Sequence, residues 1–250
     1  MLPAMCGRFT QQTPTSEIAR IFEAEDLAWD PGEHYNVAPT DPAAVVVERR
    51  TDDDPEVTRR AVVLYRWGLL PHWVDDPRRA AAKAINARAE TVATSGLFRE
   101  AFRRRRCLVP VDSFFEWQGQ GAARTPLRIH DPSGAPLALA GLWAGGKDPE
   151  TGEILRTFTI VTSRPNAFME PIHDRMPVVL RPEDWARWLE PGPREASELL
   201  AMLEPRTDLA LAAHAVPRLV NNVRNQGPAL IERVDPEEPA QLSLTAPARS

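Results

Sequence analysis

Residues 107–117, with the sequence CLVPVDSFFEW, contain two short apolar runs separated by Asp112. Runs of this length that are rich in β-branched and aromatic residues predict β-strands, here at 107–111 and 113–117. The acidic segment 52–55 predicts a hairpin loop between two further strands. Working outward from residues 107–117, similar runs predict strands at 43–47, 61–67, 127–130, 137–143, 158–162, 176–180 and 213–216.

Helices are expected mainly toward the two ends of the chain. Thr13-Pro14 opens a short helix, and further helices are predicted at 95–102, 182–189 and 194–203. Strands therefore dominate the middle, and the 25 prolines among 250 residues are about twice the usual ~5%. This order predicts a single-domain α+β fold built on a closed or nearly closed antiparallel sheet, rather than a βαβ repeat.

We expect one domain over residues 5–232. Residues 1–4 are interpreted as a leader from a mis-called start, because a second methionine, Met5, lies close behind Met1. Residues 236–250 are rich in proline and alanine and are predicted to be a disordered tail.

The composition excludes several classes of protein. The net charge of −5 excludes a uniformly basic nucleic-acid coat but leaves a local basic groove open. Two cysteines make no disulfide framework, and no pair of His or Cys residues has zinc-ligand spacing, so neither a metal nor another cofactor is expected. No apolar window approaches the ~18 residues of a membrane span, and the expected location is the cytoplasm.

Cys6 directly follows Met5, so removal of Met5 would make it the first residue. A leading cysteine carries an α-amine and a thiol on adjacent carbons, and that pair can close a thiazolidine ring on an aldehyde. The amine has a pKa near ~7.7–8.0 and the thiol one near ~8.5, so both supply some nucleophile at neutral pH. The alternative is a buried structural thiol.

Two further residues are candidates for acid–base chemistry. Glu116 lies in an apolar strand, where it is either solvated on the outer face or a carboxylate in a partly apolar cleft with a raised pKa. His173 is either a surface-loop histidine or a general acid that titrates near neutral pH. We give little weight to Asp174 as its partner, because adjacent residues rarely face each other.

Other segments suggest contacts to nucleic acid. Asn86 and Arg88 share one face of an extended segment and would suit a sugar–phosphate, or else are a turn and a surface residue. Trp73, in a loop-like setting, would stack on an unpaired base if it is exposed, whereas Trp67 is assigned to the core. The basic run 103–106 is interpreted as a solvated helix end, with a contact to DNA as the less favoured alternative.

Seven segments in this order together resemble the SRAP family, the SOS-response-associated peptidase family, whose members form DNA–protein crosslinks at abasic sites. The resemblance covers nearly the whole chain, from Met5 to about Ile231. The segments are MCGRF (5–9), YNVAPT (35–40), WGLLPHW (67–73), NARAET (86–91), FFEW (114–117), HDRMP (173–177) and NNVRN (221–225).

The resemblance implies roles for particular residues. It implies Cys6 as the crosslinking nucleophile, with Asn86, Glu116 and His173 as the other active-site residues. It also implies that Arg88 and Arg175 contact the DNA backbone. Pro39 and Trp73 would lie beside the bases that flank the lesion. The implied partner is single-stranded DNA that contains abasic sites, the implied fold is a pseudo-barrel of β-strands with flanking helices and a basic groove, and we expect a monomer.

The sequence departs from the family pattern in two places. Residues 1–4 precede the expected start, and Val74-Asp75-Asp76 follows Trp73 where relatives often carry a second aromatic residue or a lysine.

Two rival functions remain open. One is a cysteine peptidase, acting on itself or on another substrate, with Cys6 as nucleophile and His173 as base. The other is a single-strand-binding module that needs Arg88, Arg175 and Trp73 but no chemistry. A Schiff base that is not trapped by the thiol would in addition permit β-elimination, a lyase activity.

Overall fold

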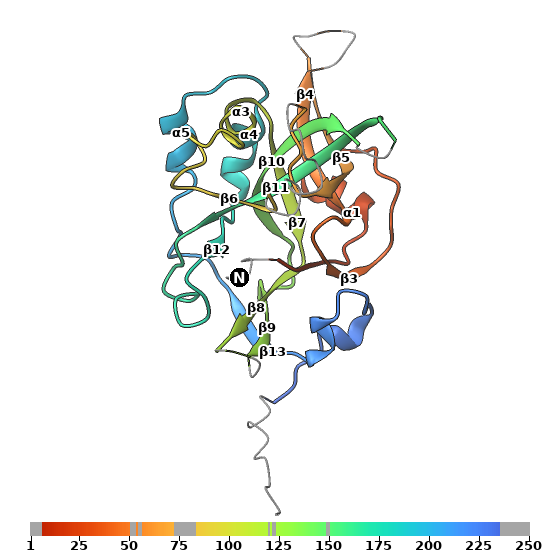
Figure 1. The fold of residues 1–250 in the computed structure, drawn as a ribbon, viewed down its shortest axis with the longest axis vertical. Helices are drawn as coiled ribbons and strands as arrows, with labels where there is room; N and C mark the ends of the chain where they lie inside the picture. Colours follow the sequence, from red (N-terminus) through yellow and green to blue (C-terminus); the bar gives the residue numbers. More distant parts are fainter. Residues whose placement is uncertain are drawn as a thin grey trace, which may run out of the picture.

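The computed structural model describes residues 7–50, 54, 57–72, 84–119, 121, 124–148 and 151–235. A β-barrel with helices over its outer side forms one part of the molecule, and a smaller sheet lies below it (Figure 1).

Five strands form a closed barrel: β4 (Pro42–Arg50), β5 (Thr58–Trp67), β7 (Arg106–Val111), β10 (Leu137–Lys147) and β11 (Ile154–Ser163). The antiparallel pairs are β5–β4, β4–β7, β7–β10 and β10–β11. A short parallel pairing of β11 with β5 then closes the ring.

Three short strands extend the barrel sheet. They are β2 (Glu25–Asp26), β6 (Asn86–Arg88) and β12 (Met176–Pro177). Both β2 on β5 and β6 on β11 are parallel pairs. The predicted antiparallel pseudo-barrel is therefore confirmed, with parallel pairing at the points where the barrel closes and where β2 and β6 join it.

The second sheet has the order β13-β9-β8-β1-β3. Its strands are β1 (Phe9–Gln11), β3 (His34–Val37), β8 (Ser113–Gln118), β9 (Thr125–His130) and β13 (Ala212–Ala215). β8 follows the barrel strand β7 after the single residue Asp112, so the segment that predicts the fold connects the two sheets.

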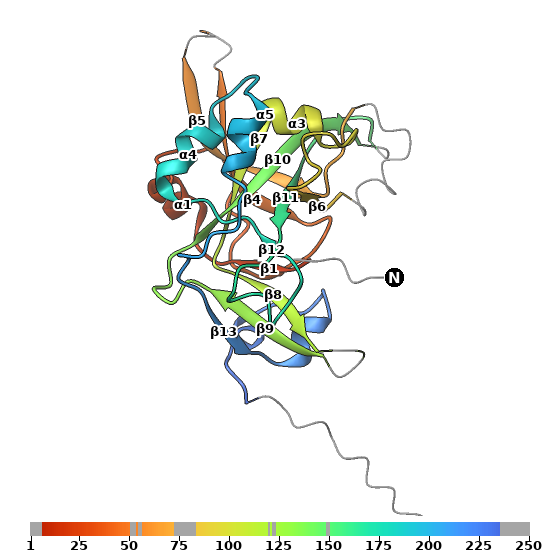
Figure 2. The same ribbon diagram turned by 90° about the vertical axis from the view of Figure 1, so that its left-hand side faces the viewer.

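The helices are short. They are α1 (Thr15–Ile21), α3 (Arg99–Arg104), α4 (Pro182–Leu189) and α5 (Ala196–Ala201), with 3-10 turns η2 (Arg218–Asn221) and η3 (Pro228–Leu230). In Figures 1 and 2, α3, α4 and α5 lie beside the barrel, and β8, β9 and β13 lie on its opposite end.

Alternation along the strands divides the core into two parts. Val45 and Val47 of β4 belong to a cluster with Trp67, Cys107 and other inward-facing residues. Their neighbours Ala44 and Val46 belong instead to the cluster that contains the buried side chains of α1, α3, α4 and α5. All six residues of β7 are buried, which explains why this strand lacks a polar face in the sequence.

Most predicted elements are present, with shifted ends. The helix expected at 182–189 has the predicted bounds, because Pro182 sits at its start and Glu183 and Asp184 occupy its first turn. The strand expected at 176–180 is shorter, and its continuation is an isolated bridge between Leu139 and Val179. The sequence missed the short strands β1, β2, β3 and β6.

The basic run 103–106 is a helix end only in part. Arg103 and Arg104 are exposed at the last turn of α3, as expected. Arg106 is instead 2% exposed and begins β7, so the solvated interpretation is wrong for this residue.

Candidate active site

Glu116 is a buried carboxylate near the end of β8. It is 3% exposed, between the buried Phe115 and the half-buried Trp117. β8 is the middle strand of its sheet, paired with β1 on one side and β9 on the other. The solvated interpretation of Glu116 is therefore wrong, and the cleft interpretation agrees with its burial.

His173 faces Glu116 from the segment between β11 and β12. Its backbone N–H donates to the Met169 carbonyl at 2.9 Å. Its Nε2 lies 4.0 Å from Glu116 Oε2, and its side chain is 17% exposed. The fold thus brings a carboxylate and an imidazole from the two sheets together, although they are distant in sequence.

The other ring nitrogen of His173 has two neighbours of opposite kind. The Arg175 backbone N–H donates to Nδ1 at 3.2 Å, which suits the neutral ring with its proton on Nε2. The Asp174 carboxylate lies 2.9 Å from the same Nδ1, which suits the protonated ring. Nδ1 therefore has a partner in either charge state, and the low weight given to Asp174 from the sequence is corrected.

Several charges act on His173. Burial lowers the pKa of His173 below its usual value; Asp174 opposes this effect, and Arg124 and Arg175 add to it. This environment favours the neutral imidazole, and Nε2 lies 4.0 Å from the buried carboxylate. Such a pair can take and release protons near neutral pH.

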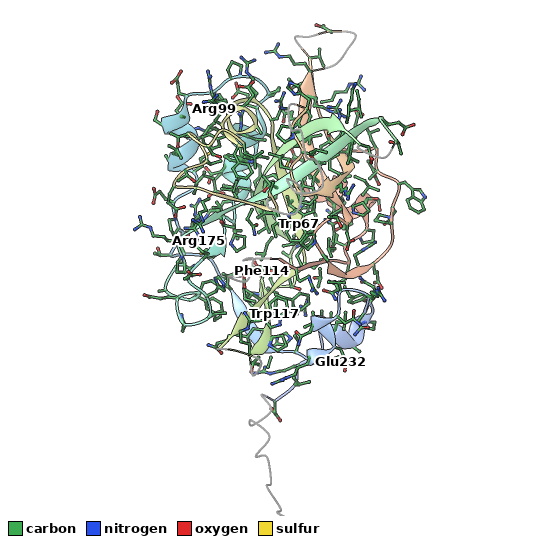
Figure 3. The ribbon with its side chains drawn as sticks, viewed as in Figure 1. Trp67, Arg99, Phe114, Trp117, Arg175 and Glu232 are labelled. Carbon is green, nitrogen blue, oxygen red and sulfur yellow. The ribbon has the colours of Figure 1, made fainter. Side chains whose placement is uncertain are left out.

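Arg175 is anchored at the edge of the barrel (Figure 3). Its guanidinium makes a bidentate contact with Glu90, with Nη2 2.9 Å from Oε2 and Nη1 paired with Oε1. Nη2 also donates to the Thr162 carbonyl of β11 at 2.8 Å. The side chain is only 12% exposed, so much of its hydrogen-bonding capacity serves the protein itself.

Asn86 and Arg88 lie on β6, beside the same end of β11. β6 pairs Asn86 with Ile160 and Arg88 with Thr162. Asn86 is half-buried, Arg88 is exposed, and Ala87 between them is buried, as the predicted shared face requires. Thr162 of β11 connects β6 with Arg175, because it pairs with Arg88 and accepts a hydrogen bond from Arg175.

The start of the described chain runs beside Glu116. The Phe115 N–H donates to the Arg8 carbonyl at 3.0 Å, which extends the β1–β8 pairing beyond Phe9. Gly7, the first described residue, is half-buried at this position. Residues 7–9 therefore run antiparallel to the end of β8 that carries Glu116.

Arg8 and Asn36 secure this segment, and the sequence did not identify either as a site residue. Arg8 Nη1 donates to Asn36 Oδ1 at 3.0 Å and to the Val220 carbonyl at 2.9 Å, and its guanidinium lies 5.9 Å from the Trp117 ring centroid. Asn36 Nδ2 donates to the carbonyls of Asn222 and Asn225. These contacts join residues of four of the seven motifs, and that sequence pattern was the available signal.

The remaining predicted residues are less informative. Cys6 and Trp73 lie outside the described residues. Pro39 is half-buried in the turn between β3 and β4. Trp67 is fully buried, which confirms its assignment to the core.

The second cysteine does not resemble a nucleophile. Cys107 is fully buried inside the barrel, and burial raises the pKa of its thiol well above the usual value. Within the described ranges, no group of three or more His, Cys, Asp or Glu side chains is placed to hold a metal ion. Among the same residues, no helix is long and apolar enough to cross a membrane.

The closed barrel, the sheet packed at its end and the buried acid–histidine pair between them define a class of α+β barrel proteins with a site at the sheet junction. A family model described as SOS response associated peptidase (SRAP) matches residues 5–223. The chain belongs to this family.

Similar proteins come from several organisms. The chain is 36% identical over 231 residues to "Abasic site processing protein YoqW" of Bacillus subtilis (strain 168), covering 91% of this chain and 99% of the relative. It is 36% identical over 238 residues to "Abasic site processing protein YedK" of Escherichia coli (strain K12), covering 92% and 100%. A solved structure from Bacteroides thetaiotaomicron aligns with a TM-score of 0.78 at 24% identity, over 92% of this chain and all of that one, which supports the fold alone.

Proposed function

We propose that this protein senses abasic sites in single-stranded DNA and captures them covalently. Cys6, exposed as the leading residue by removal of Met5, forms a thiazolidine with the ring-opened sugar aldehyde and shields the lesion. The observation that carries the proposal is the buried Glu116 carboxylate, 4.0 Å from His173 Nε2, on the strand that binds Arg8 near the start of the described chain. Relatives with the printed name "abasic site processing protein" support the same activity.

The chain geometry supports Cys6 as the nucleophile. The Phe115 N–H, one residue before Glu116, donates to the Arg8 carbonyl, and Gly7 precedes Arg8 in the chain. Consecutive Cα atoms are about 3.8 Å apart, so an aminothiol attached to Gly7 has a short tether to Glu116. The other thiol, Cys107, is fully buried in the barrel.

The proposed chemistry needs no oxidant or cofactor. The Cys6 amine adds to the aldehyde carbon, and loss of water from the carbinolamine gives a Schiff base. The thiol then adds to the same carbon while its proton passes to the nitrogen, which closes the ring. The second addition is intramolecular, where effective molarities of ~10⁵ M or more are reached in well-oriented systems.

Each polar residue has a proposed role. Glu116 orients the amine and accepts its proton, and His173 protonates the sugar ring oxygen to favour the open aldehyde. Asn86 holds the sugar or its phosphate. His173 suits its role because Nδ1 has a partner before and after proton transfer.

The DNA path is proposed to follow the exposed face of β6. Arg88 is exposed there, and Arg164 and Arg124 act on Glu90 and His173, respectively, so cationic side chains gather around the site. Arg175 adds to this charge, but Glu90 already holds one edge of its guanidinium. Pro39 and Trp73 remain the proposed neighbours of the flanking bases.

The boundaries and the setting of the activity are also proposals. We infer a single functional domain over residues 5–232 and a monomer acting in the cytoplasm on the nucleoid; the expectations for residues 1–4 and 236–250 concern residues outside those that the structure describes. The intact mass of the protein isolated from cells tests the first step, because it identifies the residue that begins the mature chain.

Capture is tested with an oligonucleotide that contains one abasic site, followed by denaturing electrophoresis. Wild-type protein is expected to give a heat-stable adduct, whereas Cys6→Ser loses it and retains only strand nicking through the Schiff base. Cys107→Ala is the matched control and should crosslink normally, because that thiol is buried away from solvent. A heat-stable adduct with Cys6→Ser would contradict the thiol's role, and a peptide cleavage activity without any DNA adduct would favour the peptidase.

Arg88→Ala is expected to weaken binding to any single strand and to lower the slope of log K against log[salt] by about 0.7, the value for one phosphate contact on a single strand. Arg99→Ala removes an equally exposed arginine on α3, well away from Arg175 in Figure 3, and should leave the slope unchanged. An unchanged slope in Arg88→Ala would remove this residue from the DNA path.

A further inference from the structure

Glu90 is an acidic residue at the edge of a site proposed to bind a polyanion, and nothing in the proposed chemistry uses it. It lies two residues after the end of β6, and its side chain is 40% exposed. Both carboxylate oxygens are taken up by the Arg175 guanidinium, and hydrogen bonds from Arg175 lower the pKa of Glu90. This bidentate arrangement is more specific than a typical surface ion pair.

The pair is fixed to the end of β11. Thr162 accepts hydrogen bonds at its carbonyl from the Arg175 guanidinium at 2.8 Å and from the Ala89 N–H at 2.8 Å. Glu90 and Arg175 are therefore both held next to one residue of the barrel. Such a three-way contact sets the position of the backbone that carries Arg175.

That backbone in turn holds His173. The Arg175 N–H donates to His173 Nδ1, two residues earlier in the chain. The Asp174 side chain between them is 88% exposed and provides no anchor to the barrel. On the other side of the turn, Gln118 Nε2 donates to the Pro171 carbonyl at 2.9 Å. The turn that carries His173 is thus held from β8 on one side and by Arg175 on the other.

We propose that Glu90 is a positioning residue of this site: by holding the Arg175 guanidinium at the end of β11, it keeps the His173 Nδ1 on the Arg175 N–H and Nε2 toward Glu116. The proposal deepens the proposed function and rests on it for its catalytic meaning. Its structural content, the state of the His173 ring, is independent of DNA.

An alternative role for Glu90 is a gate that competes with DNA phosphate for Arg175. The geometry favours positioning, because Arg175 is 12% exposed and also bound to a backbone carbonyl, so release from Glu90 alone would not free it for a phosphate. The two roles predict opposite results. Loss of Glu90 slows capture if it positions His173, and strengthens DNA binding if it is a gate.

The charged groups that face His173 determine how its titration should respond. They are Glu116 from β8, Asp174 and Arg175 from its own turn, and Arg124 from the segment before β9. Arg175 already lowers the pKa of His173, and Glu90 is the counter-charge of Arg175. Removal of the carboxylate therefore shifts the His173 titration to lower pH.

The test compares Glu90→Ala and Glu90→Gln with the matched control Glu100→Ala, which removes an exposed carboxylate whose partner is Arg104 on α3. The first readout is ¹⁵N NMR of the His173 ring in the protein without DNA. In the wild type we expect the Nε2–H tautomer for the neutral ring. In Glu90→Ala we expect loss of that preference and titration at lower pH, with Glu90→Gln intermediate because it keeps one acceptor.

The second readout is the rate of adduct formation on the abasic oligonucleotide as a function of pH. Glu90→Ala should slow capture by about 10- to 100-fold, as a displaced catalytic group does, with the alkaline limb, where the general acid His173 loses its proton, moved to lower pH and with the affinity for the strand nearly unchanged. Glu100→Ala should match the wild type. If the wild type forms no adduct, the proposed function is wrong. The NMR comparison of the His173 ring then still tests whether Glu90 positions that ring. Unchanged His173 resonances in Glu90→Ala, or tighter DNA binding with faster capture, would overturn the proposal.

Discussion

The hydroxyl of Tyr65 is buried inside the barrel. Tyr65 is 4% exposed, its ring packs against Trp143, and within the described part of the chain the hydroxyl has no hydrogen-bond partner. Burial raises the pKa of this phenol, consistent with a polar group in apolar surroundings. A buried hydroxyl without a partner costs about 1–3 kcal/mol.

Tyr65→Phe should therefore keep or increase the stability of the protein. We expect the free energy of unfolding to rise by about 1 kcal/mol, measured by urea denaturation. The other tyrosine is a matched control, because the Tyr35 hydroxyl donates to Glu33 at the surface, and Tyr35→Phe should change stability by less than about 0.5 kcal/mol. A loss above about 1 kcal/mol in Tyr65→Phe would mean that the hydroxyl has a partner.

For single residues, the sequence indicated which side chains carry chemistry, but it did not indicate how buried they are or what they contact. Glu116 alternates with apolar neighbours, a pattern equally typical of a solvated strand face. Its burial depends on β1, β9 and the turn with His173, which approach from distant parts of the chain. The Asp174 contact with His173 depends on a local turn, and the sequence contains no periodic signal for it.

At the scale of elements, one buried side chain joins two helices to the barrel. Arg106, the first residue of β7, donates to the carbonyls of Trp188 at 2.8 Å and Phe102 at 3.0 Å. It also contacts the Glu190 and Gly192 carbonyls. Burial lowers the pKa of Arg106 to about 10, so the guanidinium remains charged at neutral pH and satisfies the carboxyl ends of α3 and α4.

Arg106→Met should destabilise the protein by about 3 kcal/mol, because it leaves these buried carbonyls without a donor. Arg106→Lys should cost less, since an ammonium reaches only some of them. Arg104→Met is the matched control: Arg104 is half exposed and pairs with Glu100 across one helical turn, a contact worth about 0.3–0.5 kcal/mol. Urea denaturation of the three variants measures the differences, and equal losses in Arg106→Met and Arg104→Met would contradict the capping role.

Elements with long apolar runs were predictable, and short ones were not. β7 and β10 have continuous runs of apolar residues, and their positions were predicted to within a few residues. β1, β3 and β6 have only three or four residues each, so neither periodicity nor composition distinguishes them from loops. They are strands because of their partners: β1 pairs with β8, β3 pairs with β1, and β6 pairs with β11.

At the scale of the whole molecule, the α+β barrel was predictable from the order of strands and helices. The closing contact was not, because β5 and β11 are separated by most of the middle of the chain and pair over only two residues, Arg66 with Thr157 and Trp67 with Phe158. The site forms at this closed barrel. β6 pairs with β11, the turn with His173 follows β11 in the chain, and Glu116 of the second sheet lies next to His173. Stability and function therefore depend on the same strand.

Stability should accordingly respond to the protonation of the histidines that join the parts of the molecule. Burial lowers the pKa of His173, and burial also lowers that of His214, whose Nε2 donates to the Ile231 carbonyl at 3.2 Å and whose ring meets His130 edge-on. A lowered pKa in the fold means that the unfolded chain binds more protons between the folded value and the ordinary ~6.5. The contribution of these histidines to the free energy of unfolding is therefore complete above about pH 6.5, and it is lost as the pH drops through the folded pKa values.

We expect urea midpoints measured from pH 7.5 to pH 5 to decrease toward acid, and the double variant His173→Gln/His214→Gln to show a flatter dependence over this range. Glu90, with its pKa lowered by Arg175, contributes in the same direction but only at lower pH, around and below the ordinary carboxyl range, so its effect is separable. The double variant could instead lose stability as steeply as the wild type between pH 6.5 and pH 5. That result would show that protonation of His173 and His214 does not cause the loss.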